Sequence, residues 1–107
     1  MTDAIKNKYG LSERDLKTIF DILEKYPEVK EVHMFGSRAK GSYKQGSDID
    51  LAIMNPGVNP TSIMRISSAF ADSSLPYKID LVDFHTIQLN DFTDHIIRVG
   101  IVFYTRQ

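Results

Sequence analysis

Residues 31–54 constrain the fold more than any other part of this sequence. An apolar run leads into the turn residues Gly36 and Ser37, and the acidic pair Asp48 and Asp50 leads into a second apolar run. Because side chains alternate between the two faces of a strand, Asp48 and Asp50 are expected on one face, with the apolar residues between and after them on the other. The segment therefore predicts two strands joined by a glycine–serine turn and a short helical piece, with two carboxylates displayed together.

Capping residues and helical spacing predict the elements on either side. Ser12 with Asp15 matches a helix-start pattern, apolar residues then recur at helical spacing, and Pro27 marks the end. Gly100 is expected at the C′ position of the last helix. Alternating helices and strands predict an α/β sheet with packed helices, in one domain spanning residues 1–107. The expected strands cover residues 31–35, 48–54, 78–84 and 101–104, and the other helices are expected over 38–44, from Pro60 or Thr61 onward, and around residues 89–99.

A third carboxylate is expected on the third strand. Asp80 alternates with Ile79 and Leu81, so it joins Asp50 on the same face of the sheet if the two strands are neighbours. Asp83 is the competing residue, but alternation places it on the side of Ile79 and Leu81. We therefore predict that Asp80, and not Asp83, completes the acidic group.

Clustered carboxylates predict a site for divalent cations. Like charges at close range repel, which favours a raised pKa or a bound cation, and Mg²⁺ with substrate phosphates fits that need. Two metal ions about 3.5–4 Å apart can clamp an in-line displacement at phosphorus. We expect Asp48 and Asp50 to hold the ion that bridges nucleotide phosphates. Asp50 and Asp80 would hold the second ion, with Asp80 also a candidate acceptor for the proton of the attacking hydroxyl.

The glycine–serine turn supplies candidate phosphate contacts. Backbone N–H groups at Gly36 and Ser37, with the Ser37 hydroxyl, can approach phosphates closely. Arg38 and Lys40 are near enough in sequence to neutralise phosphate charge. A P-loop is excluded because Ser42 stands where its lysine is required, and no dinucleotide-binding glycine motif occurs.

Composition excludes several other classes of protein. The net charge of −1 provides no strongly basic face, so nucleic-acid binding is not expected, and the absence of cysteine removes disulfides and cysteine zinc sites. The histidines His33, His85 and His95 lack zinc-ligand spacing and are interpreted as structural or exposed. No apolar run reaches membrane-spanning length and no signal-peptide pattern is seen, so a cytoplasmic protein without membrane contact is expected.

These residues resemble the motif of the minimal nucleotidyltransferases (MNT) in the DNA polymerase β-like superfamily. That motif is Gly-Ser, a short helix, Asp-x-Asp and a later strand aspartate, which match Gly36, Ser37, Asp48, Asp50 and Asp80. The flanking segments 35–41 and 47–51 are especially similar, and the resemblance covers most of the chain. It implies a mixed sheet flanked by helices, Mg²⁺ and a nucleoside triphosphate donor, with Ser47 in the nucleotide-binding motif beside Arg38 and Lys40.

The resemblance also implies a partner. Many small members act as antitoxins of HEPN-domain toxins, and some transfer AMP from ATP to a tyrosine of the toxin. A protein adenylyltransferase of this kind is the leading hypothesis. Two alternatives stay open: an antitoxin that neutralises its partner by contact alone, and a transferase that acts on small molecules such as aminoglycosides. Assembly as a homodimer or a hetero-oligomer is also left open.

Overall fold

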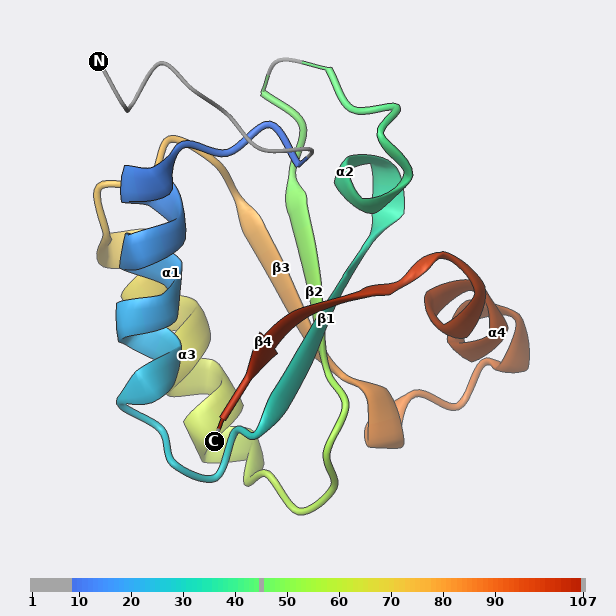
Figure 1. The fold of residues 1–107 in the computed structure, drawn as a ribbon. Helices are drawn as coiled ribbons and strands as arrows, with labels where there is room; N and C mark the ends of the chain where they lie inside the picture. Colours follow the sequence, from blue (N-terminus) through green and yellow to red (C-terminus); the bar gives the residue numbers. More distant parts are fainter. Residues whose placement is uncertain (1–8, 45, 107) are drawn as a thin grey trace.

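One four-stranded mixed sheet organises the part of the chain that this computed structural model describes, residues 9–44 and 46–106. Its strands lie in the order β3-β2-β1-β4 (Figure 1). β2 runs parallel to β3, whereas β1 is antiparallel to both of its neighbours. The strands are β1 (Glu31–Phe35), β2 (Ile49–Ile53), β3 (Ile79–Asp83) and β4 (Ile101–Thr105), so the predicted mixed α/β architecture is confirmed.

Helices pack on both sides of this sheet. α1 (Glu13–Glu24) and α3 (Pro60–Asp72) lie together on one side, while α2 (Gly36–Lys40) and α4 (Asn90–Val99) lie on the other (Figure 1). α1 begins as predicted, because the Ser12 hydroxyl accepts a hydrogen bond from the Asp15 N–H at 3.1 Å. α3 begins with Pro60 at its first position, preceded by an Asn59 side chain that caps the Thr61 N–H at 2.8 Å.

The alternation of β1 and β2 divides the apolar residues into two layers. The larger layer lies under α1 and α3 and contains side chains with no solvent exposure, among them Met34, Leu51 and Ile53. The smaller layer lies under α4, where Ile96 packs against Phe35 and Ala52. Both faces of the central strands are therefore covered, except where polar side chains occupy them.

Three local features differ from the sequence predictions. α2 starts at Gly36 and ends at Lys40, earlier than expected, because Gly41 adopts a left-handed conformation (φ 80°) and its N–H bonds to the Ser37 carbonyl. An unpredicted 3₁₀ turn, η2 (Phe84–Thr86), follows β3. Gly100 ends α4 with φ −69° and is not left-handed; glycine is needed there because a Cβ would overlap the Ile96 carbonyl.

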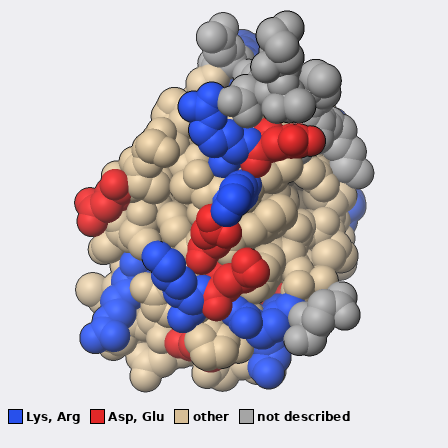
Figure 2. All heavy atoms as spheres, turned by 60° about the vertical axis from the view of Figure 1, so that its left-hand side comes forward, with Lys and Arg blue, Asp and Glu red and all other residues tan. Residues whose placement is uncertain are grey.

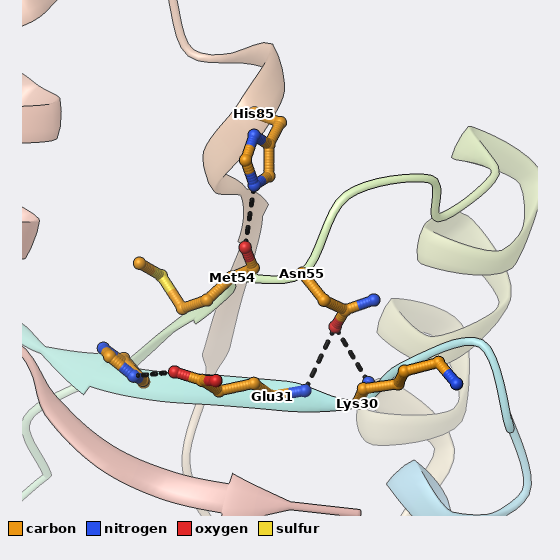
Figure 3. A network of polar contacts seen from close by, with 6 residues as sticks. Lys30, Glu31, Met54, Asn55 and His85 are labelled. Carbon is orange, nitrogen blue, oxygen red and sulfur yellow. Dashed lines mark hydrogen bonds and ion pairs between the residues drawn. The ribbon is translucent and has the colours of Figure 1, made fainter.

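Hydrogen bonds from side chains to the backbone secure the end of the sheet where β1 begins. The Asn55 side chain accepts from the Lys30 and Glu31 N–H groups at 2.8 and 3.0 Å (Figure 3). Arg106 donates to carbonyls at and after the end of α1, including those of Glu24 (2.9 Å) and Val29 (3.2 Å). This end of the molecule is held by hydrogen bonds between side chains and backbone N–H and carbonyl groups, and it carries none of the predicted site residues.

Charges of both signs are interspersed over the side of the molecule that carries α1 (Figure 2). The pair Lys17 and Asp21, 2.8 Å apart on this helix, is typical of the pattern. Such a surface lacks the single-sign field that non-specific nucleic-acid binding requires. Within the described residues, no helix has the length and apolar character needed to cross a membrane.

Candidate active site

Asp50 and Asp80 lie side by side on one face of the sheet. The parallel register of β2 and β3 pairs Asp50 with Asp80. Ile49 and Leu51, the neighbours of Asp50 along the strand, are fully buried on the other face. Alternation therefore brings these two carboxylates together as predicted.

Asp83, the competing residue, has a structural role at the end of β3. Its side chain is 9% exposed and accepts a hydrogen bond from the His85 N–H at 3.0 Å, which caps η2. An acceptor used in this way is unavailable to a ligand on the opposite face. The structure thus agrees with the choice of Asp80.

Asp48 approaches the pair from the beginning of β2. It precedes Ile49, the first residue of the strand, and its side chain is exposed. Its negative charge nevertheless reaches Asp50 and contributes to the raised pKa described next. The three predicted carboxylates therefore gather at one corner of the sheet.

The pKa of the Asp50 carboxyl is raised above its ordinary value. Partial burial is the largest cause, and the negative charges of Asp80 and then Asp48 add to it. The His95 imidazole on α4 acts in the opposite direction. Ionised Asp50 is thus disfavoured in the folded protein, and a cation at this corner would relieve the repulsion.

Two basic side chains that the sequence analysis did not assign to the site border the carboxylates. The Lys78 Nζ lies 3.7 Å from Asp80 Oδ1. The His95 ring packs edge-on against Phe35, with centroids 6.5 Å apart, and Phe35 pairs with Asp50 across β1 and β2. Strand alternation could have located Lys78, two residues before Asp80. No sequence signal locates His95, because only the packing of α4 brings it here.

Gly36 supports the Asp50 carboxylate directly. Its backbone adopts φ 77°, a left-handed conformation that side chains with a Cβ rarely take. A Cβ at this position would overlap Asp50 Oδ2. The glycine is therefore required twice, once for the turn from β1 into α2 and once for the close approach of the acidic side chain.

The other predicted nucleotide-binding residues lie in and after α2. Ser37 is half-buried in its first turn, and Lys40 is exposed at its end. Ser47 lies just before Asp48, and its hydroxyl accepts a hydrogen bond from the Lys44 N–H at 2.8 Å. Ser37 follows Gly36 and Ser47 precedes Asp48 in the sequence, and the contacts of all three residues with a nucleotide stay predictions.

Arg38 has partners different from those predicted. Its side chain is only 2% exposed, and its guanidinium donates to the carbonyls of Ser47 and Tyr9. The prediction that Arg38 neutralises phosphate finds no support in this arrangement. The buried Arg38 side chain instead connects α2 with the residue before Asp48 and with the segment before α1.

Two of the three histidines have local partners, as their interpretation as structural residues requires. The His85 ring bonds to the Met54 carbonyl at 2.7 Å (Figure 3), and the His33 ring lies 2.6 Å from the Glu31 carboxylate. Neither is paired with the acidic corner. His95 alone acts electrostatically on Asp50.

The donor atoms of the acidic corner suit Mg²⁺ in kind, because hard divalent cations prefer carboxylate oxygens. Burial is the largest cause of the raised Asp50 pKa, and the charges of Asp80 and Asp48 add to it, so a cation near these three groups would be stabilised. Across residues 9–44 and 46–106, however, no three histidine or acidic side chains are already arranged as a metal site. Mg²⁺ binding by Asp48, Asp50 and Asp80 therefore stays a prediction that their chemistry supports.

Comparison with known proteins identifies sequence relatives over most of the chain. The family described as "Polymerase beta, Nucleotidyltransferase" matches residues 17–107. A Haemophilus influenzae protein named probable protein adenylyltransferase MntA is 33% identical over 100 residues, which cover 91% of this chain and 85% of that protein.

Solved structures share the fold at lower sequence identity. A chain of a toxin–antitoxin crystal structure with AMP-PNP has a TM-score of 0.69 and 22% identity, over 87% of this chain and 75% of that chain. A chain from a complex of tri-AMPylated Shewanella oneidensis HEPN toxin with MNT antitoxin has a TM-score of 0.62 and 20% identity, over 86% and 71%. A Sulfolobus solfataricus putative nucleotidyltransferase has a TM-score of 0.54 and 23% identity, over 85% and 77%.

Proposed function

This chain belongs to the polymerase β nucleotidyltransferase family, and from that premise we propose that it transfers AMP from ATP to a tyrosine hydroxyl of a HEPN-type toxin. One observation of the structure carries the proposal: the register of β2 and β3 pairs Asp50 with Asp80 beside Gly36 and Asp48. The name of the Haemophilus influenzae relative supports the adenylyl group, and the AMPylated HEPN toxin in a structural neighbour supports the acceptor. The neighbour with AMP-PNP supports ATP as donor.

The proposed reaction is a single displacement at the α-phosphorus of ATP. The tyrosine oxygen forms a new bond to this phosphorus while the bond to pyrophosphate breaks, and the phenolic proton passes to a carboxylate. Asp80 is the proposed acceptor of that proton, at the edge of the site where the toxin can approach along β3. Gly36 and Ser37 provide backbone N–H groups for the phosphates of the nucleotide.

The carboxylates have a second role in positioning the donor. Asp48, Asp50 and Asp80 are the residues that would hold Mg²⁺, which when bound neutralises phosphate charge and acidifies the attacking hydroxyl. Lys78 offsets the charge of Asp80 at 3.7 Å, and it is placed to contact a phosphate once that carboxylate has another partner. The proposal treats residues 1–107 as one domain and the reaction as cytoplasmic, in keeping with ATP as the proposed donor.

Intact mass measurement tests the proposal. The protein is incubated with Mg²⁺, ATP and its purified toxin partner, and both chains are weighed in parallel with a toxin activity assay. We expect the toxin to gain whole AMP units and lose activity. The variant with Asp48→Ala and Asp50→Ala should add no mass, and the toxin should stay active.

Two outcomes would favour the alternatives. Toxin silenced by the double variant without added mass would indicate neutralisation by contact. Transfer to an aminoglycoside in the absence of any protein acceptor would indicate a small-molecule transferase.

A further inference from the structure

Arg38 is buried beside the acidic corner, and within the described part of the chain none of its hydrogen bonds goes to a carboxylate. Its side chain is 2% exposed although it carries a full positive charge. Nε and Nη2 both donate to the Ser47 carbonyl, at 3.1 and 2.9 Å, and Nη1 donates to the Tyr9 carbonyl at 2.8 Å. Burying an arginine against neutral acceptors costs folding free energy, so these contacts are expected to serve a purpose that offsets this cost.

The double hydrogen bond to Ser47 fixes the residue that precedes Asp48. The Ser47 carbonyl and the Asp48 Cα belong to the same planar peptide unit. Two donors converging on that carbonyl oxygen therefore orient the plane in which the Asp48 Cα lies. The Ser47 N–H also bonds to the Lys44 carbonyl at 2.9 Å, so the carbonyl is presented by a closed turn.

The same guanidinium contacts the segment that leads to Asp80. Its central carbon lies 4.6 Å from the centroid of the Tyr77 ring, within the range of cation–π attraction. Tyr77 precedes Lys78, whose carbonyl accepts a hydrogen bond from the Ile49 N–H at 2.9 Å. The beginnings of β2 and β3 are therefore connected both to each other and to Arg38.

A second ring completes the enclosure of the guanidinium. Tyr43 lies with its centroid 5.2 Å from the central carbon of Arg38. A Cβ on Gly10 would overlap this ring, so Tyr43 packs tightly on the turn at Tyr9 and Gly10. The guanidinium is thus held by two rings and by three hydrogen bonds to two carbonyl oxygens.

From these contacts we propose that Arg38 is a positioning residue, which fixes the backbone at Asp48 and at the start of β3 and does not contact the nucleotide. Lysine cannot replace it, because a single ammonium lacks the planar fork that reaches Ser47 and Tyr9 together and stacks on rings. The expected loss of kcat rests on the proposed transfer reaction. The expected change in the backbone at Asp48 does not rest on it.

Arg38→Lys tests this assignment, with Arg106→Lys as the matched control. Within the described residues, Arg106 also donates to backbone carbonyls, but it does so near the start of β1, at the opposite end of that strand from Asp50. For Arg38→Lys we expect kcat of AMP transfer to fall about 10- to 100-fold, with KM for ATP within about threefold. Hydrogen exchange at the Asp48 and Ile49 amides should become faster. Arg106→Lys should lower the melting temperature and leave kcat unchanged.

Several results would overturn the assignment. A rise in KM with kcat unchanged in Arg38→Lys would make Arg38 a nucleotide ligand. If kcat and amide exchange are both unchanged in Arg38→Lys, Arg38 has no local role. The same conclusion follows if Arg106→Lys loses as much kcat as Arg38→Lys. If Arg38→Lys does not fold, Tyr77→Leu is used in its place. The same fall in kcat, near-constant KM and faster amide exchange are expected, and the same results would contradict the assignment. If wild-type protein transfers no AMP, the proposed function fails, and amide exchange alone decides the role of Arg38.

Discussion

Asp50 combines three properties that rarely coincide on one side chain. It is the middle carboxylate of the acidic corner, it touches the left-handed glycine Gly36, and its pKa is raised by burial and by Asp80 and Asp48. Its ionised form therefore costs folding free energy in the absence of a cation. Destabilised groups of this kind are common at functional sites, where the side chains that bind a ligand are held in place at a cost in folding stability.

Gly36→Ala should be more damaging than Gly41→Ala, although both glycines have nearly equal φ values, 77° and 80°. Each substitution carries a backbone cost of about 1–2 kcal/mol. Only at Gly36 would the new Cβ also displace the Asp50 carboxylate, since nothing lies within 4 Å of a Cβ at Gly41. We expect AMP transfer to fall about 100-fold further in Gly36→Ala, measured as initial rates on folded protein. Equal rates for the two variants would refute the role given to this contact.

Asp50→Asn should abolish transfer and stabilise the protein at neutral pH. The amide keeps the shape of the carboxylate but removes its repulsion with Asp80 and Asp48. Because solvent screens part of this repulsion at a partly exposed side chain, the expected gain is small, about 0.5 kcal/mol, or about 2–4 °C in melting temperature. Thermal unfolding without Mg²⁺ measures it, with Asp72→Asn on the exposed end of α3 as a control. A lower melting temperature for Asp50→Asn would show that the ionised carboxylate is stabilising.

At the scale of elements, strand alternation and helix caps were predictable because they depend on residues close in sequence. The Ser12 cap and the buried side of β2 follow from such local rules, whereas the face shared by Asp50 and Asp80 also required β2 and β3 to be neighbours. The role of Arg38 and the approach of His95 were not predictable. Their partners at Tyr9, Tyr77 and Phe35 come from other elements and meet them only after folding.

The hydrogen bond between α3 and the loop that joins α1 to β1 should give stability a defined pH dependence. The Ser62 hydroxyl donates to the Glu28 carboxylate, and this hydrogen bond is the largest cause that lowers the Glu28 pKa below its ordinary value of 4.5. A lowered pKa in the folded state means that the stabilisation is complete above pH 4.5 and is lost as pH falls through the lowered pKa.

Ser62→Ala should therefore reduce the free energy of unfolding by about 0.5 kcal/mol near pH 7, a small value because the pair is screened by solvent. The difference from wild type should disappear in acid. Urea unfolding across the pH range measures it, with the exposed Ser68→Ala on the same helix as the control. A difference that persists unchanged at low pH would separate Ser62 from the ionisation of Glu28.

For the whole molecule, the residues that secure the backbone and the residues of the candidate active site lie at opposite ends of the sheet. Asn55 and Arg106 secure the backbone where β1 begins, and the carboxylates gather where β1 gives way to α2. The fold class could be predicted from the order of elements along the chain. Alternation along β3 could place Lys78 on the face of Asp80, but the 3.7 Å contact between their charged groups could not be predicted, because it depends on side-chain conformations.

Mg²⁺ with a non-hydrolysable ATP analogue should raise the melting temperature of the whole domain. Ligand at one hundred times its Kd adds about 2.7 kcal/mol to stability when it binds only the folded state. The variant with Asp48→Ala and Asp50→Ala should show no such shift under the same conditions. A shift of equal size in both proteins would place nucleotide binding elsewhere.

The most direct test of the central claim follows the phosphate that is transferred. Wild-type protein, Mg²⁺ and the toxin partner are incubated with ATP labelled at either the α- or the γ-phosphate, and covalent label on the toxin is measured after denaturation. An adenylyltransferase site built from Asp48, Asp50 and Asp80 predicts that α-label is retained on the toxin, that γ-label leaves with pyrophosphate, and that Asp80→Asn abolishes retention. Retained γ-label, or no retained label from either position while the toxin is silenced, would contradict it.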